Sequence, residues 1–211
     1  MQTTVVFDFG GVLVKIEPGL AAACRAAGLP ERVRLETPEL RRQWEELDRL
    51  HQVGRIGTHE FIERIGVALG GAYARDELEK VHRRLLGDPY PGVAELVMEL
   101  HARGVATGIL SNTNPSHWHA LREEYPAFRE LFASHPRYVQ PSHLLGARKP
   151  DPSIYRAYLE LTELAPSELV FFDDFTENVA AAREEGWRAF RIDAARDPMA
   201  EIRDTLARLG V

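Results

Sequence analysis

Strand-like runs of β-branched and aromatic residues alternate with helical patterns along most of this 211-residue chain. Apolar residues recur with helical spacing at 91–103 and again at 176–185. The strand patterns lie at 3–9, 104–110, 168–174 and 187–192, with a weaker one near Arg137. Strands that alternate with helices form a parallel sheet with helices on both faces. The sequence therefore predicts an α/β, Rossmann-like fold.

One stretch, from about residue 16 to residue 86, breaks this alternation. It contains helical patterns at 39–50, 58–69 and 75–86 and no convincing strand pattern. Both of its connections would leave the sheet at the carboxyl ends of the strands, where such sheets bind ligands. We therefore expect a small α-helical cap formed by residues 16–86, inserted into a core formed by 1–15 and 87–211.

The composition restricts the possible functions. A formal net charge of -6 argues against nucleic acid as a partner, because non-specific binding to it needs a cationic face. The single cysteine, Cys24, excludes an intramolecular disulfide and is expected as a small buried residue in a reducing compartment. There is no run of apolar residues as long as a membrane helix, and no signal-peptide pattern. We expect a cytoplasmic protein with no membrane partner, and the sequence leaves its oligomeric state open.

Polar residues follow the first two strong strands at the edge where ligands bind. Asp8 precedes Gly10 and Gly11, which let a backbone approach a ligand closely, although a turn-forming aspartate is the alternative. Ser111 ends the second strand, and Asn114 precedes a helix. A hydroxyl and backbone N–H groups at a helix N-terminus bind phosphate oxygens, but the same residues also serve as ordinary helix caps.

Charged residues mark the later part of the same edge. Lys149 lies between a glycine-containing loop and a helix that starts near Pro152, where a lysine can neutralise a phosphoryl group and a neighbouring carboxylate. The alternative is a solvated surface charge. Asp173 and Asp174 end a very apolar strand, and adjacent carboxylates repel each other unless a counter-ion is present. A hard cation with oxygen ligands satisfies this need better than an acidic turn does.

In this order, these patterns resemble the four motifs of the haloacid dehalogenase (HAD) superfamily of aspartate-nucleophile hydrolases. The segments "FDFGGVL", "LSNTN", "GARKPDPSIY" and "FFDDFTENVAAAREEG" are most similar to the bacterial alpha-D-glucose-1-phosphate phosphatase subgroup. The last segment is also similar to the N-terminal domain of soluble epoxide hydrolases. The resemblance covers nearly the whole chain, and it implies a HAD-like core with the helical block as its small cap.

The resemblance also implies a Mg²⁺-dependent phosphatase that hydrolyses a small phosphomonoester. Asp8 would be the catalytic nucleophile that forms an aspartyl phosphate, and Lys149 would offset charge on the phosphate and on Asp8. Phosphoryl oxygens would be bound by Ser111, Asn112 and Lys149. The residues implied for Mg²⁺ are Asp8, Gly10 through its backbone carbonyl, Asp173 and Asp174.

Gly10 departs from the pattern of the wider superfamily, in which many phosphatases carry an aspartate as general acid and base at this position. General acid–base catalysis contributes about 10² to 10⁴ in rate, so its loss slows such an enzyme without abolishing its activity. A proton donor matters least when the leaving group is a good one. We therefore expect sugar 1-phosphates to be preferred over sugar 6-phosphates. His51 could supply the proton instead, but a solvated histidine at a helix end is the expectation.

Three other functions compete with this interpretation. A 2-haloacid dehalogenase shares the nucleophilic aspartate without a metal, and the Asp173–Asp174 pair argues against it. Gly10 argues against a phosphomutase, which must protonate sugar oxygens. A catalytically weak phosphosugar- or partner-binding protein would not need the intact set of charged residues. Elsewhere, we expect His117 and His119 to lie on different helix faces and Arg55 to lie in a turn, and the packing residues to include Trp44, Trp118 and Trp187.

Overall fold

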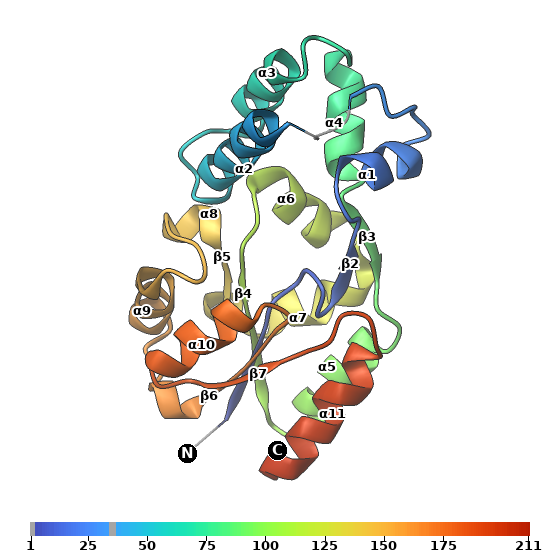
Figure 1. Cartoon of the computed structure of the whole chain (residues 1–211). Helices are drawn as coiled ribbons and strands as arrows, with labels where there is room; N and C mark the ends of the chain where they lie inside the picture. Colours follow the sequence, from blue (N-terminus) through green and yellow to red (C-terminus); the bar gives the residue numbers. More distant parts are fainter. Residues whose placement is uncertain (1–2, 34–36) are drawn as a thin grey trace.

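The computed structural model describes residues 3–33 and 37–211 of the chain (Figure 1). A five-stranded sheet with the order β5-β4-β1-β6-β7 forms its centre, and all of its pairings are parallel. The strands are β1 (Thr4–Phe7), β4 (Ala106–Ser111), β5 (Val139–Pro141), β6 (Leu169–Asp173) and β7 (Arg188–Arg191). The predicted α/β fold with a parallel sheet is confirmed.

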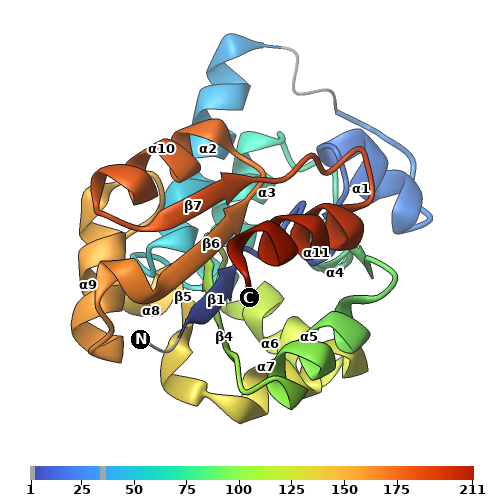
Figure 2. The same cartoon turned by 90° about the horizontal axis from the view of Figure 1, so that it is seen from below.

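Helices cover both faces of this sheet, as Figure 2 shows. One face packs against α5 (Val93–Ala102), α6 (Pro115–Glu123), α7 (Arg129–Ser134) and α11 (Pro198–Leu209). The other face packs against α9 (Pro152–Thr162) and α10 (Thr176–Glu184). A short helix, α8 (Ser142–Leu145), and three 3-10 turns at Pro126–Phe128, Pro136–Tyr138 and Pro166–Glu168 complete the connections.

The two central strands are apolar on both faces because both faces are covered. Val6 and Phe171 pack toward α9 and α10, whereas Phe7 and Phe172 pack toward α5 and α11. Every residue of β1 and β6 is buried, as expected for central strands of a parallel sheet. Both strands therefore read as unbroken apolar runs, which is the pattern that made them predictable.

A block of four helices follows β1 in the sequence and lies at the end of the molecule that also carries α6 and α8 (Figure 1). The helices are α1 (Leu20–Ala26), α2 (Pro38–Gln52), α3 (Thr58–Ala68) and α4 (Arg75–Arg83). They pack around a hydrophobic cluster of their own, in which Cys24 is buried as expected. The predicted helices at 39–50, 58–69 and 75–86 correspond to α2, α3 and α4.

Two features of this region were not predicted. The antiparallel strands β2 (Val14–Ile16) and β3 (Leu86–Pro89) connect the block to the sheet, so the expectation of no strand between 16 and 86 is wrong at both ends. These strands have only three and four residues, and β3 contains glycine and proline, so they show no strand periodicity. The alanine-rich helix α1 was also missed.

The expectation that His51 is solvated is wrong. Its exposed fraction is 0%, its ring stacks on Phe61 with a centroid distance of 4.6 Å, and its Nε2 lies 3.1 Å from Oγ1 of Thr58. Burial lowers the pKa of His51 to about 4. Arg55 is exposed in the turn that follows, as expected.

Among the described residues, no helix combines the length and the apolar character that a bilayer crossing requires.

Candidate active site at the carboxyl edge of the sheet

The sheet order brings the predicted residues together. β1 lies between β4 and β6, with Phe7 level with Ile109 on one side and Phe172 on the other. Asp8 directly follows β1, and its N–H donates to the carbonyl of Phe172 at 2.9 Å. These strand ends open into a cavity of about 1110 Å³. The predicted site residues that line the cavity are Asp8, Gly10, Ser111, Asn112 and Asp174.

Lys149 is the cation at the centre of this edge. Its exposed fraction is 1%, and its Nζ lies 2.6 Å from Oδ2 of Asp173 and 3.1 Å from Oδ1 of Asp8. It also lies 5.2 Å from the centre of the Phe171 ring. Burial by itself would lower the pKa of Lys149, but the charges of Asp173 and Asp8 more than offset this effect and raise it. The ammonium group therefore stays charged although it is buried.

Asn112 holds the backbone that carries this lysine. Its Oδ1 accepts a hydrogen bond from the N–H of Lys149, and its Nδ2 donates to the carbonyl of Lys149, both at 2.8 Å. The two bonds link the loop after β4 to the loop before α9. With the side chain so engaged, a contact between Asn112 and a phosphoryl oxygen would fall to its main chain.

Asp173 is fully engaged within the protein. Its Oδ1 accepts from the N–H of Phe175 and from Nδ2 of Asn178, both at 2.9 Å, while its Oδ2 accepts from Lys149. The first two bonds fix Asp173 to the start of α10. Its contacts suit it to position Lys149. A role of Asp173 in supporting a metal stays a prediction.

Asp8 has the surroundings of a buried nucleophile. Its Oδ1 accepts from the N–H of Phe9 at 2.7 Å and from Lys149. Burial raises the pKa of Asp8, while the ammonium group of Lys149 and a hydrogen bond with Ser111 act against this shift. Loss of Lys149 would therefore favour the protonated carboxyl, which is not a nucleophile.

Asp174 has a carboxylate oxygen that lacks a partner. Its Oδ1 is buried without a hydrogen bond from any residue that the structure describes. Burial, with the charges of Asp8 and Asp173, raises the pKa of Asp174 to about 7. Gly11, at φ 71°, leaves room for it, because a Cβ at this position would overlap the Asp174 carboxylate.

These carboxylates fit a divalent cation. One oxygen each from Asp8, Asp173 and Asp174 lies within 4.8 Å of the others. Three carboxylates and one ammonium group leave two negative charges in excess, which is the charge that Mg²⁺ would balance. Mg²⁺ prefers oxygen ligands and binds through one or two carboxylates, so Asp8 and the unpartnered Oδ1 of Asp174 suit it.

Comparison with known proteins identifies the family. The family model for haloacid dehalogenase-like hydrolases matches residues 2–186. The chain belongs to this family. It is 30% identical to the sesquiterpene phosphatase astK of Aspergillus oryzae, over 86% of this chain and 85% of that protein. It is 26% identical to D-ribitol-5-phosphate phosphatase of Bacteroides thetaiotaomicron, over 96% of this chain and 97% of that protein. The expectation of a hydrolase of this superfamily is confirmed, and by homology the chain is one of its phosphatases.

A solved structure shares the fold of this haloacid dehalogenase-like hydrolase. HAD family enzyme bt-2542 of Bacteroides thetaiotaomicron, in complex with magnesium and inorganic phosphate, superposes with a TM-score of 0.77. The two proteins are 22% identical, and the match covers 93% of this chain and 97% of the other. At this identity the likeness establishes the HAD-like fold.

The opposite wall of the cavity contains residues that sequence reasoning missed. Trp44, Asp48 and Gln52 of α2 line it, together with Arg148 from the loop before α9. Trp44 was expected only to pack, and it does contact Phe61, with 6.2 Å between ring centres. The spacing of four residues between the three α2 side chains was the available signal, but nothing in the sequence showed which face of α2 meets the cavity.

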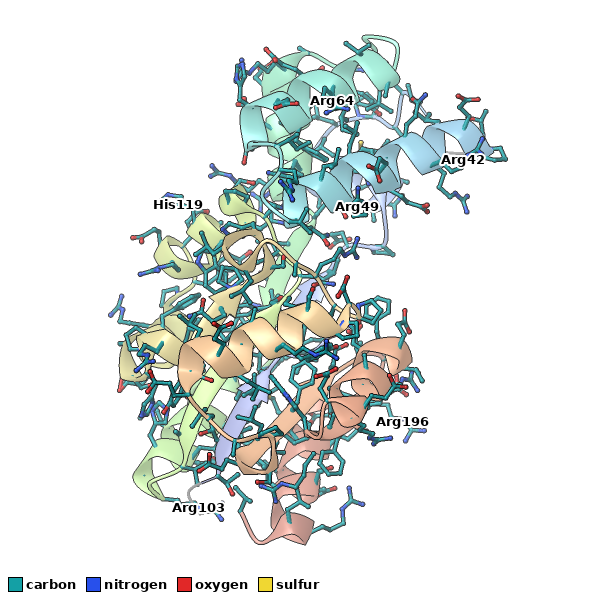
Figure 3. The ribbon with its side chains drawn as sticks, turned by 90° about the vertical axis from the view of Figure 1, so that its left-hand side faces the viewer. Arg42, Arg49, Arg64, Arg103, His119 and Arg196 are labelled. Atoms are coloured by element: carbon teal, nitrogen blue, oxygen red, sulfur yellow. The ribbon has the colours of Figure 1, made fainter. Side chains whose placement is uncertain are left out.

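The histidines of α6 behave as predicted. His117 lines the cavity and donates from Nε2 to the carbonyl of His82 at 2.8 Å. His119 is exposed on the outer surface of α6 (Figure 3).

Trp118 and Trp187 are packing residues, as expected. Asn114 caps α6 by accepting from the N–H of His117 at 3.0 Å, so its role here is structural.

Magnesium binding is expected to depend on pH, because the cation competes with a proton on Asp174. The pKa of Asp174 in the folded protein is above the ordinary value, so protonated Asp174 favours the folded, metal-free protein. This contribution to stability is lost as the pH rises through about 7. Below about pH 7, Mg²⁺ must displace the proton, and its affinity falls with the pH. Calorimetric Mg²⁺ titrations at several pH values, in buffers of different ionisation enthalpy, measure the affinity and the number of protons released on binding. A constant affinity without proton release would contradict this prediction.

A methyl group at Gly11 is expected to impair the metal site selectively. In Gly11→Ala the new Cβ pushes against the Asp174 carboxylate, so we expect the Kd for Mg²⁺ to rise at least about tenfold, equivalent to about 1.4 kcal/mol. Gly19→Ala is the matched control, because Gly19 also has a positive φ, of 87°, but its Cβ would meet open space. Both variants bear backbone strain, because both positions have a positive φ. Equal Mg²⁺ affinity in the two variants would refute the steric role of Gly11.

Proposed function

We propose that this haloacid dehalogenase-like hydrolase is a Mg²⁺-dependent phosphatase that cleaves a small phosphomonoester through an aspartyl phosphate on Asp8. The observation that carries the proposal is the buried charge cluster. In it Lys149 contacts both Asp8 and Asp173, while one oxygen of Asp174 has no partner. The phosphatase names of two relatives and the magnesium and phosphate in the bt-2542 structure support it.

The proposed reaction consists of two displacements at one phosphorus atom. The carboxylate of Asp8 attacks phosphorus in line, and the bond from phosphorus to the leaving-group oxygen breaks. Water then attacks the phosphorus of the aspartyl phosphate, which releases inorganic phosphate and restores Asp8. Lys149 offsets negative charge on the phosphoryl group, and Ser111 and Asn112 are proposed to bind its oxygens.

Asp8, Asp174 and the carbonyl of Gly10 are proposed to hold Mg²⁺, with Asp173 beside them. When bound, the cation would supply charge stabilisation for the transferring phosphoryl group. The carboxylates must be ionised to take this role, and Lys149 favours that state for Asp8. A 2-haloacid dehalogenase would give no reason for the unpartnered oxygen of Asp174, so the phosphatase is preferred to that alternative.

The four-helix block is proposed to act as a cap over this site. Its helix α2 contributes side chains to the cavity that also contains Asp8. The proposed division is a core of 1–15 and 87–211 and a cap of 16–86. Closure of such a block would exclude water from the charge cluster, where electrostatic interactions are strongest at low dielectric.

The preferred substrate is proposed to be a sugar 1-phosphate, as in the alpha-D-glucose-1-phosphate phosphatase subgroup. Gly10 cannot donate a proton to the leaving group. His51 does not replace it, because this histidine is buried against Phe61 and does not line the cavity. Without a general acid at position 10, leaving groups with a lower pKa are expected to react faster.

Phosphate release is expected to need both the metal and Asp8. The purified protein, assayed with p-nitrophenyl phosphate and glucose 1-phosphate, is expected to release phosphate with Mg²⁺ and to lose this activity with EDTA. Asp8→Asn removes the nucleophile and is expected to lower kcat by at least about 10⁴, equivalent to about 5.5 kcal/mol. Glu45→Gln, on the exposed side of α2, is the matched control and should retain activity. Release that is insensitive to both EDTA and Asp8→Asn would rule out the proposal.

The position of the phosphate on the sugar is expected to affect the rate. Glucose 1-phosphate has a better leaving group than glucose 6-phosphate, so we expect its kcat/KM to be about tenfold higher or more. Both compounds carry the same hexose and the same charge, so the comparison isolates the leaving group and its placement. Equal or faster hydrolysis of glucose 6-phosphate would contradict the preference.

A further inference from the structure

One face of α2 meets the cavity with a regular set of side chains. Trp44, Asp48 and Gln52 are spaced by four residues, which places them along one side of the helix, and all three line the cavity that contains Asp8. The neighbouring residues Glu45 and Arg49 are exposed. Arg49 is labelled in Figure 3 on this helix. The cavity therefore has a wall of charged and catalytic residues at the sheet and a second wall at α2.

Asp48 offers a hydrogen-bond acceptor at this second wall. Its Oδ2 accepts from Nε2 of Gln52 at 2.7 Å, and no described residue donates to its Oδ1. Burial raises the pKa of Asp48, and the charge of Arg148 acts against this shift. The carboxylate thus faces the cavity with one oxygen held in place and the other available.

Arg148 offers hydrogen-bond donors in the same part of the cavity. It directly precedes Lys149 and lines the cavity, and within the described parts of the chain its guanidinium has no ion-pair or hydrogen-bond partner. A guanidinium carries five N–H donors in a fixed plane. Asp48 and Arg148 together therefore present an acceptor and a set of donors whose hydrogen-bonding capacity the protein leaves partly unused.

The third component is a flat apolar surface. The indole of Trp44 is held edge-on to Phe61, with an interplanar angle of 79°, and borders the cavity near these polar groups. A ring that carries C–H groups on its faces and hydroxyls at its edge complements such a set, because hydroxyls both donate and accept. A purely hydrocarbon group would instead leave Oδ1 of Asp48 and the N–H donors of Arg148 without hydrogen bonds, at a considerable cost.

We propose that Trp44, Asp48 and Arg148 form the leaving-group subsite, which selects phosphate esters of polyhydroxylated rings such as hexoses. The inference rests on the proposed phosphatase function and adds the residues that choose the substrate. Trp44 packs against the ring, Asp48 accepts from its hydroxyls and Arg148 donates to them. None of the three takes part in the displacement at phosphorus.

The test compares two substrates that share the phosphoryl chemistry and differ in the ring. In Asp48→Ala, KM for glucose 1-phosphate is expected to rise about 10- to 100-fold, the range for loss of a hydrogen bond to a charged group. Acetyl phosphate has no ring and no sugar hydroxyl. The fold-change in its KM is expected to be about one tenth of that for glucose 1-phosphate, or smaller. Trp44→Leu should show the same pattern. Glu45→Gln, an exposed residue on α2, should change neither KM.

Several outcomes would overturn the subsite. One is an equal change in KM for glucose 1-phosphate and acetyl phosphate, and another is a change in kcat with an unchanged KM. The third is an isoprenoid monophosphate that is hydrolysed better than glucose 1-phosphate at a rate that Asp48→Ala does not alter. An effect on kcat alone would mean that Asp48 acts as a proton donor. Binding of glucose 1-phosphate measured by calorimetry in the presence of Mg²⁺ separates this inference from the proposed function. If wild-type protein releases no phosphate, the phosphatase proposal fails, yet binding that is lost in Asp48→Ala supports the subsite and absent binding refutes it.

Discussion

The contact of buried Lys149 with Asp173 and Asp8 is the interaction on which the rest of the site depends. Removing three charged groups from water costs several kcal/mol each, and the attraction between them recovers this only with good geometry and further hydrogen bonds. The fold supplies that geometry. Asn112 holds the backbone of Lys149 from both sides, and Asn178 fixes Asp173 from the first turn of α10. Such an arrangement contributes little to stability, and the role proposed for it is in phosphate chemistry.

The sheet makes this cluster possible by fixing the level at which each strand ends. Phe7 and Phe172 are neighbours in register, so Asp8 emerges one residue beyond the last pairing. A shift of one residue in β1 would turn Asp8 to the other face of the sheet. The aromatic side chains below the cluster, including Phe171 under the Lys149 ammonium group, exclude water and strengthen the attraction between the charges. Apolar packing and charge placement are therefore parts of a single constraint.

Much of this edge could be predicted, because buried strands leave strong local patterns and their polar terminal residues stand out. Asp8, Ser111 and Asp174 indeed share one cavity. Features that depend on packing between distant segments could not be predicted. His51 looks solvated at the end of an amphipathic helix, but Phe61 from α3 and His82 from α4 cover it. The side chain of Asn112 binds the main chain of a residue 37 positions away, so only its own main chain is left for the proposed contact with phosphate. Local sequence carries no record of either contact.

Substrate choice follows from the same geometry. Gly10 provides no proton donor, so discrimination between phosphate esters falls to the groups that bind the leaving group. On the sheet side, Lys149 is proposed to act at the phosphoryl group, and the adjacent Arg148 lines the cavity that α2 also borders. The hydroxyl of Ser142 donates to the carbonyl of Gln52 at 2.6 Å, which ties the end of α2 to α8. This contact is one of the links between the α2 wall and the sheet edge that carries the charge cluster. The groups proposed to bind the leaving group and the charges around Asp8 are therefore parts of one connected structure.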